Sequence, residues 1–145
     1  MCTSIIFSPQ DHYFGRNLDL EVTFGQQVVV TPRNYVFNFR KMPEMKQHYA
    51  MVGIALDAGD YPLYFDAANE KGLGMAGLNY PDNATYYDVV DGKDNIASFE
   101  FIPWILGQCE TVADAKKLLE KTVSYTHLTL PTTLHECRSR WWAYH

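Results

Sequence analysis

The sequence predicts an α+β fold with an antiparallel sheet. Short runs of apolar and β-branched residues, separated by turn residues, succeed one another through the first half of the chain, and two helical stretches follow them. Strands joined by short turns pair antiparallel, and helices gathered at one end of a chain pack against such a sheet. With 145 residues the chain has the size of one ordinary domain.

The predicted strands open with a hairpin. Residues 2–7 and 12–19 are apolar-rich runs, and the Ser-Pro-Gln-Asp segment between them is a turn signal. The later predicted strands share apolar, β-branched or aromatic runs bounded by turn residues. They cover residues 27–31, 35–40, 49–56, 63–67 and 73–78. The hairpin is expected to bring residues 16–19 back toward residue 2.

Two helices are predicted near the end of the chain. Residues 96–109 carry apolar side chains at helical spacing, and Pro103 is expected either to kink this helix or to mark its first turn. Residues 112–121 show the same spacing, and Thr111 is suited to cap their N-terminus. No internal repeat or domain linker interrupts the pattern.

Charge and cysteine content exclude several classes of protein. The chain has 12 Lys and Arg against 17 Asp and Glu, so its net charge of −5 argues against a nucleic-acid or anionic-membrane surface. It has neither the apolar run of a secretory signal nor one long enough to span a bilayer. Three cysteines have no metal-like spacing and are too few for a disulfide framework, so we expect a reducing, cytoplasmic setting. No cofactor is expected.

The composition changes at residue 123. Residues 123–145 contain no Gly, Asp or Lys, yet they hold two of the three Trp and three of the five His. The run Val-Ser-Tyr-Thr-His-Leu-Thr-Leu-Pro-Thr resembles a translated sequencing adapter. We therefore expect two segments, a natural one over residues 1–122 and a non-native tail over residues 123–145. The alternative is a natural Thr-rich terminal segment.

Cys2 is the first candidate for chemistry. Removal of Met1, which a small second residue permits, would give Cys2 both a thiol and a free α-amine. The ordinary pKa is about 8.5 for a thiol and roughly 7.7–8.0 for an α-amine, so a neutral amine can accept the thiol proton near pH 7. The alternative is an inert cysteine, because a reactive one needs an electropositive, partly open setting.

Three other residues suit such a nucleophile. Arg16 would favour the thiolate by its charge, and Asp19 would hold the α-amine in position. Asn79 has a side-chain amide that can donate to a developing oxyanion. Each also has a plain structural explanation, since Arg16 and Asp19 can form a strand-end ion pair and Asn79 precedes a Tyr-Pro turn.

Four motifs together resemble the choloylglycine hydrolase family, which contains bile salt hydrolases and penicillin V acylases. They are Met-Cys-Thr at 1–3, Phe-Gly-Arg-Asn-Leu-Asp at 14–19, Asn-Glu-Lys-Gly-Leu-Gly at 69–74 and Gly-Leu-Asn-Tyr-Pro at 77–81. The resemblance covers residues 1–122. It implies an N-terminal nucleophile hydrolase with a four-layer αββα sandwich, in which Cys2 attacks an amide and forms a thioester.

The resemblance also assigns roles. Cys2 is implied to be nucleophile and base, Arg16 and Asp19 to be its partners, and Asn79 to be an oxyanion or substrate donor. Asn79 favours glycine- or taurine-conjugated bile salts over penicillin V as the small-molecule substrate. Leu18, Phe24 and Phe65 can line a steroid pocket, although core packing is the simpler explanation for Phe65. The family also implies a homotetramer without a metal.

The chain departs from the family in length, since family members are more than twice as long. The downstream half would supply another Asn, a further active-site Arg and the rest of both sheets, so we expect this chain alone to be inactive. Three hypotheses therefore remain open. The parent protein is a bile salt hydrolase, or an acylase of penicillin V or N-acyl homoserine lactones, or the chain is a non-catalytic, partly folded fragment.

Overall fold

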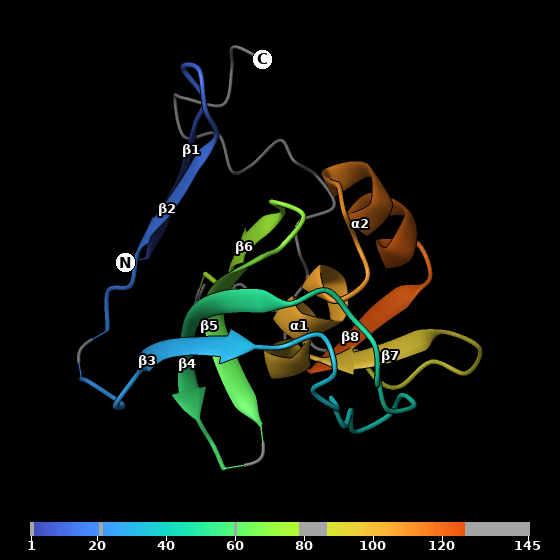
Figure 1. The fold of residues 1–145 in the computed structure, drawn as a ribbon. Helices are drawn as coiled ribbons and strands as arrows, with labels where there is room; N and C mark the ends of the chain where they lie inside the picture. The colour runs from blue at the N-terminus through green and yellow to red at the C-terminus, as the bar shows by residue number, and fades with distance from the viewer. Residues whose placement is uncertain (1, 21, 60, 79–86, 127–145) are drawn as a thin grey trace.

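A computed structural model of the chain describes residues 2–20, 22–59, 61–78 and 87–126. Its main sheet is antiparallel, with the strand order β3-β4-β5-β6. The strands are β3 (Gln27–Thr31), β4 (Met51–Asp57), β5 (Pro62–Asn69) and β6 (Gly74–Ala76). Figure 1 shows this sheet with the helices on one side of it. The predicted class, α+β with an antiparallel sheet, is confirmed.

The first two strands form a separate ribbon. β1 (Thr3–Phe7) and β2 (Tyr13–Asn17) pair antiparallel, with Ser4 opposite Arg16. The tip of this ribbon stands away from the main sheet in Figure 1. Its apolar side chains are consequently exposed, and Ile6 keeps 67% of its surface accessible. The predicted hairpin is confirmed, but it adds little to the core.

β5 is one of the two inner strands of the main sheet and its most buried strand. Its pairing with β4 shifts register between Ile54 and Ala55, because Ile54 lies opposite Asp66 whereas Ala55 lies opposite Tyr64. Phe65 is thus the extra residue of a β-bulge, and the burial pattern of β5 changes phase there. Bulges change the direction in which neighbouring side chains point. Here the bulge leaves both Asp66 and Ala67 buried.

The short helices η1 (Ser98–Glu100) and α1 (Phe101–Leu106) pack against the main sheet, and a second pair of strands and α2 (Val112–Leu119) lie next to them. β7 (Asp94–Ala97) leads through η1 into α1. α2 follows, and β8 (Thr122–Thr126) then returns to pair with β7 in parallel. The Thr111 hydroxyl accepts a hydrogen bond from the N–H of Asp114, so Thr111 caps α2 as predicted.

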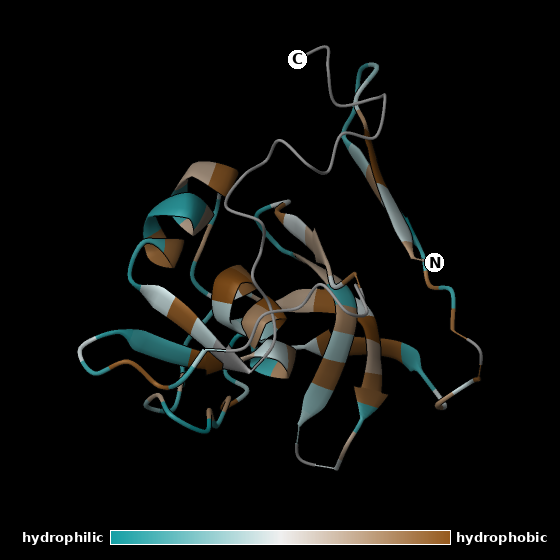
Figure 2. Ribbon diagram, turned by 180° about the vertical axis from the view of Figure 1, so that it is seen from behind, coloured by the Kyte–Doolittle hydropathy of each residue, from teal (hydrophilic) through white to brown (hydrophobic). Residues whose placement is uncertain are grey.

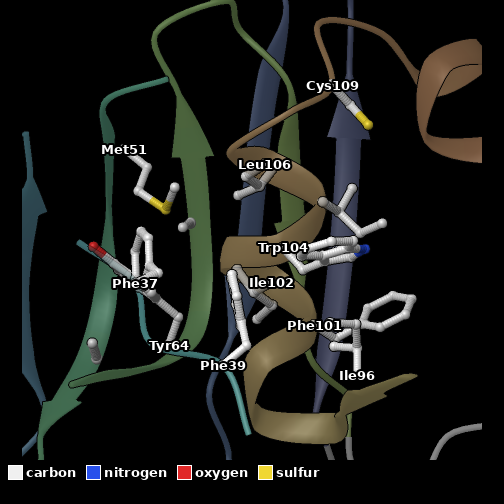
Figure 3. Packing of buried hydrophobic residues seen from close by; sticks show 13 residues of the cluster. Phe37, Phe39, Met51, Tyr64, Ile96, Phe101, Ile102, Trp104, Leu106 and Cys109 are labelled. Atoms are coloured by element: carbon white, nitrogen blue, oxygen red, sulfur yellow. The ribbon is translucent and has the colours of Figure 1, made fainter. Parts of the chain in front are cut away.

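The hydrophobic core lies between α1 and the sheet. Figure 3 shows Ile102, Trp104 and Leu106 of α1 on one side and Met51 and Tyr64 of the sheet on the other. In Figure 2 the apolar segments of α1 face the sheet, while the apolar residues of the ribbon lie outside this layer. The opposite face of the sheet stays open, and Val30 on β3 is 69% exposed. No helix in the described ranges is long and apolar enough to cross a membrane.

Two element predictions were wrong. Residues 35–40 do not form a strand, because only Phe37 pairs, in an isolated bridge with Met45, and its fully buried ring packs in the core. The aromatic side chains of Phe37 and Phe39 are buried and the polar one between them is exposed, so an irregular loop gives the same alternation as a strand. Residues 96–109 do not form one helix, because the stretch begins within β7 and turns into α1 only at Phe101. Pro103 lies in the first turn of α1, as one of the two predictions had it.

The expected boundary between residues 122 and 123 falls inside β8. The Asp94 N–H donates to the carbonyl oxygen of Lys121 at 2.9 Å, just before the paired strands begin. The residues after Thr126 lie outside the described part of the chain.

Candidate active site

Cys2 lies immediately before β1 and is half-buried, with a free thiol. Its thiol donates a long hydrogen bond to the backbone carbonyl oxygen of Asp19, with 3.8 Å between sulfur and oxygen. Asp19 follows the end of β2, so the two-stranded ribbon places these residues side by side. The structure therefore brings Cys2 and Asp19 together, as the hairpin predicted.

Arg16 lies on β2, close in register to Cys2. Ser4 is directly opposite Arg16, and side chains two residues apart on a strand point to the same face. Cys2 precedes the first paired residue, Thr3, and continuing the register by one residue makes it a diagonal neighbour of Arg16. Within a sheet this relation separates two residues by about 7–8 Å.

The guanidinium of Arg16 is buried against the main sheet. Its Nε lies 3.5 Å from Oδ2 of Asp66, and only 6% and 12% of the two side chains are exposed. Its Nη2 donates a hydrogen bond to the carbonyl oxygen of Gly77. Among the described residues, Nε and Nη1 of Arg16 and Oδ2 of Asp66 have no hydrogen-bond partner. The guanidinium is thus fixed from the side of the sheet while retaining spare donors.

Asp66 is a member of this cluster that the sequence reading missed. It lies on β5 beside the bulge, and its Oδ1 accepts a hydrogen bond from the N–H of Ile54 at 3.3 Å. Both carboxylate oxygens are therefore engaged, one with the sheet and one with Arg16. A single charged residue inside the apolar run 63–67 was the signal that could have identified it, because buried charges need partners.

The remaining predicted residues lie at different distances from this cluster. Asn79 lies outside the described residues. Leu18 is half-buried beside Asp19, whereas Phe24 lies in the connection before β3 and is 53% exposed. Phe65 is half-buried at the bulge, and its carbonyl oxygen accepts the N–H of Gly77 at 2.8 Å. Phe65 is thus near the segment that holds Arg16, because the carbonyl oxygen of Gly77 accepts from that arginine.

A surface hollow of about 750 Å³ lies elsewhere on the molecule. Its charged side chains are paired with one another or with neighbours, as in the bidentate hydrogen bonds from Arg33 to Glu70 and the 2.9 Å ion pair between Lys71 and Glu110. The lining residues are Arg33, Gln47, His48, Tyr49, Glu70, Lys71, Gly107 and Gln108. Neither Cys2 nor Arg16 belongs to this hollow, so we do not place the chemistry there.

The cluster around Cys2 contains the elements of nucleophilic catalysis by a thiol. The ribbon and the residue before it carry a half-buried free thiol and a buried guanidinium, and a cation near a thiol favours the nucleophilic thiolate. Within the described ranges, no group of three His, Cys, Asp or Glu side chains is arranged to hold a metal ion.

Comparison with known sequences gives a family match. The family described as linear amide C–N hydrolases, choloylglycine hydrolase family, matches residues 2–137. A bile salt hydrolase/transferase from Lactiplantibacillus plantarum is 47% identical over 121 residues, which are 83% of this chain and 37% of that protein. A conjugated bile acid hydrolase from Lactobacillus acidophilus is 35% identical over 144 residues, which are 97% of this chain and 45% of that protein.

Solved structures agree with the sequence relatives. The mutant C2A conjugated bile acid hydrolase from Clostridium perfringens superposes with a TM-score of 0.77 at 36% identity, over 84% of this chain and 38% of that one. A penicillin V acylase from Agrobacterium tumefaciens, at 22% identity and a TM-score of 0.60, shares the fold over 87% of this chain. The chain thus spans less than half the length of these relatives.

Proposed function

The chain belongs to the choloylglycine hydrolase family of linear amide C–N hydrolases, and from this we propose that its parent protein hydrolyses the amide bond of glycine- or taurine-conjugated bile salts. The observation that supports the proposal is the grouping of Cys2, Asp19 and Arg16 at the base of the ribbon, in a chain 47% identical to a bile salt hydrolase/transferase. Bacterial relatives with conjugated bile acids in their names support the substrate class.

The proposed reaction uses Cys2 twice. After removal of Met1, the α-amine of Cys2 accepts the thiol proton, and the sulfur attacks the amide carbonyl. Collapse of the tetrahedral intermediate breaks the C–N bond, and the α-ammonium donates its proton to the departing glycine or taurine amine. Water, deprotonated by the α-amine, then attacks the thioester, and its cleavage releases the bile acid and restores the thiol.

The partners of Cys2 have separate proposed roles. The charge of Arg16 stabilises the thiolate, and Asp19 orients the α-amine. Asn79 donates to the oxyanion, a contribution that is typically worth about 3–4 kcal/mol in enzymes. Leu18, Phe24 and Phe65 contact the steroid in the complete protein. The parent protein is proposed to work as a cytoplasmic homotetramer without a metal.

The present chain is proposed to be a segment without activity of its own. The open face of the sheet and the exposed ribbon leave apolar surface, such as Ile6 and Val30, without cover among the described residues. Apolar surface of this kind is covered in stable domains. Residues 123–145 are proposed to be the non-native tail. Sequencing the parent gene beyond the Thr122 codon tests this, because a natural tail would be encoded there unchanged.

A substrate panel tests the proposed activity. The full-length parent protein is incubated with glycocholate, taurocholate, penicillin V and an N-acyl homoserine lactone, and the released amine is measured. Release from the bile salts by wild type, and its loss in Cys2→Ser, is the expected result. Release from penicillin V or the lactone alone would assign the acylase activity instead, and release from none of the four would contradict both assignments.

A further inference from the structure

The strongest unassigned feature of the molecule is the buried carboxylate of Asp66. It lies at the centre of the main sheet, on a different element from Cys2, Arg16 and Asp19. Within the described part of the chain it forms an ion pair with Arg16, at 3.5 Å. Burial of an unpaired charge costs free energy, so the ionised carboxylate of Asp66 is stable at this position because Arg16 lies against it.

Two contacts fix the position of the Arg16 guanidinium. Asp66 Oδ2 attracts its Nε edge, and the carbonyl oxygen of Gly77 accepts from Nη2. The carboxylate is itself held, because its other oxygen accepts from the N–H of Ile54 next to the bulge. The guanidinium is a planar fork, so two fixed contacts determine its orientation. The bulge in β5 therefore helps to determine where the positive charge of Arg16 lies, because it positions the carboxylate of Asp66.

We propose that Asp66 is a positioning residue, which holds Arg16 where its positive charge favours the thiolate of Cys2. The proposal rests on the proposed function of Cys2 as a nucleophile. Continuing the ribbon register by one residue puts Cys2 one diagonal step from Arg16, and Nη1 of Arg16 has no hydrogen-bond partner among the described residues. Asp66 reaches Arg16 from the main sheet, at Nε, so the carboxylate acts on the sulfur through Arg16.

The alternative is a structural clasp that merely joins the ribbon to the sheet. A clasp and a positioning residue predict different behaviour of the thiol. Loss of a clasp changes how accessible Cys2 is, and this alters alkylation at every pH. Loss of positioning changes the fraction of thiolate, and this alters alkylation near pH 7 but not where every thiol is ionised.

The experiment measures alkylation of Cys2 in this chain by iodoacetamide at pH 7.0 and 9.5, with the site of modification assigned by peptide mass spectrometry. The variants are Arg16→Gln, Asp66→Asn and the double variant. Glu70→Gln is the matched control, because it also removes a carboxylate that is paired with an arginine, but that arginine is Arg33 and not Arg16. Asparagine keeps the size of Asp66 and an acceptor for Ile54.

We expect alkylation at pH 7.0 to slow roughly three- to tenfold in Arg16→Gln and in Asp66→Asn, and to change less than twofold at pH 9.5. In the double variant Asp66→Asn adds nothing to Arg16→Gln. Glu70→Gln matches wild type at both pH values. Since the thiol itself is measured, these results are independent of whether the parent protein cleaves any bile salt.

Several results would overturn the proposal. They are faster alkylation of Asp66→Asn at pH 7.0, equal slowing at both pH values, an unchanged rate, or a full additional slowing in the Arg16→Gln background. Faster alkylation would mean that Asp66 only neutralises an arginine that stays in place. Where Asp66→Asn lacks the far-UV spectrum of wild type, Asp66→Glu is tested. It keeps the charge but shifts the carboxylate by one methylene, so slowing of twofold or more at pH 7.0 supports positioning, and an unchanged rate overturns it.

Discussion

The side-chain amide of Asn69 donates a hydrogen bond of 2.8 Å to the carbonyl oxygen of Leu106, which joins the end of β5 to the last turn of α1. The same amide donates to the carbonyl oxygen of Cys109, also at 2.8 Å. The Oδ1 of Asn69 accepts from the N–H groups of Lys71 and Leu73 at 3.1 and 3.0 Å. One buried side chain thus supplies hydrogen-bond partners to backbone groups both in the turn after β5 and at the end of α1.

Replacement of this side chain should destabilise the fold. In Asn69→Ala two carbonyl oxygens and two N–H groups lose their partner, and we expect the free energy of unfolding to fall by about 2–3 kcal/mol. Urea denaturation followed by circular dichroism measures this. Asn38→Ala is the control, because Asn38 is exposed, and a loss of the same size there would contradict the explanation.

Removal of core volume should also have a large effect. Leu106 of α1 is fully buried, so Leu106→Ala is expected to lower the free energy of unfolding by about 2–5 kcal/mol through lost burial and a cavity. Val112→Ala is the comparison, since Val112 is 61% exposed and should change stability by less than about 1 kcal/mol. Equal effects in urea denaturation would show that α1 does not pack as described.

The pH dependence of stability should show the contribution of ionised Glu70 to the free energy of unfolding. Hydrogen bonds from Arg33 and from the N–H of Ala50 lower the pKa of Glu70 to about 2, from an ordinary value of 4.5. A pKa that is lower in the folded state stabilises the fold above the ordinary value, and this stabilisation is lost as the pH falls from 4.5 toward 2. Wild type should therefore lose more stability over this range than Glu70→Gln.

The measurement is the urea midpoint of both proteins between pH 7 and pH 2. The two midpoints should differ at pH 7 and converge toward pH 2. High salt at pH 7 should also reduce their difference, because the ion pair of Glu70 with Arg33 is exposed on the arginine side. A difference of the same size at pH 2 and pH 7 would contradict the ion-pair explanation.

Cys109 should behave as an inert thiol. Burial, and then the charge of Asp114, raises the pKa of the Cys109 thiol, and only 2% of the residue is exposed. Iodoacetamide at pH 7 is expected to modify Cys2 well before Cys109, as mass spectrometry of the two peptides would show. Faster modification of Cys109 would contradict both its burial and the view that Cys2 is a poised nucleophile. In urea Cys109 should become reactive.

Local signals predicted much of the fold. The hairpin, β3 and α2 with its Thr111 cap follow from turn residues, β-branched runs and capping chemistry, all of which act over a few residues. The errors arose where contacts between residues distant in the sequence determine the local structure. Around Phe37, aromatic and other residues alternate as they would in a strand. The ring of Phe37 is nevertheless buried in the core, and the surrounding segment is irregular.

The candidate site was predictable only in part. The turn between β1 and β2 places Asp19 beside Cys2, and a hairpin can be read from local sequence. The ion pair joins Arg16 to Asp66, which is 50 positions later in the sequence and lies beside the bulge in β5. Neither periodicity nor a turn signal predicts such a bulge. Side-chain partners that come from another sheet strand are a property of the tertiary fold.

The most direct measurement of the central claim is the intact mass of the full-length parent protein during turnover of glycocholate. The protein should lack Met1, and acid quenching should trap a cholyl group, without glycine, on the peptide that begins with Cys2. Cys2→Ala should show neither the adduct nor glycine release. Glycine release by a protein that retains Met1, or by Cys2→Ala, would contradict the role of Cys2 as an N-terminal nucleophile.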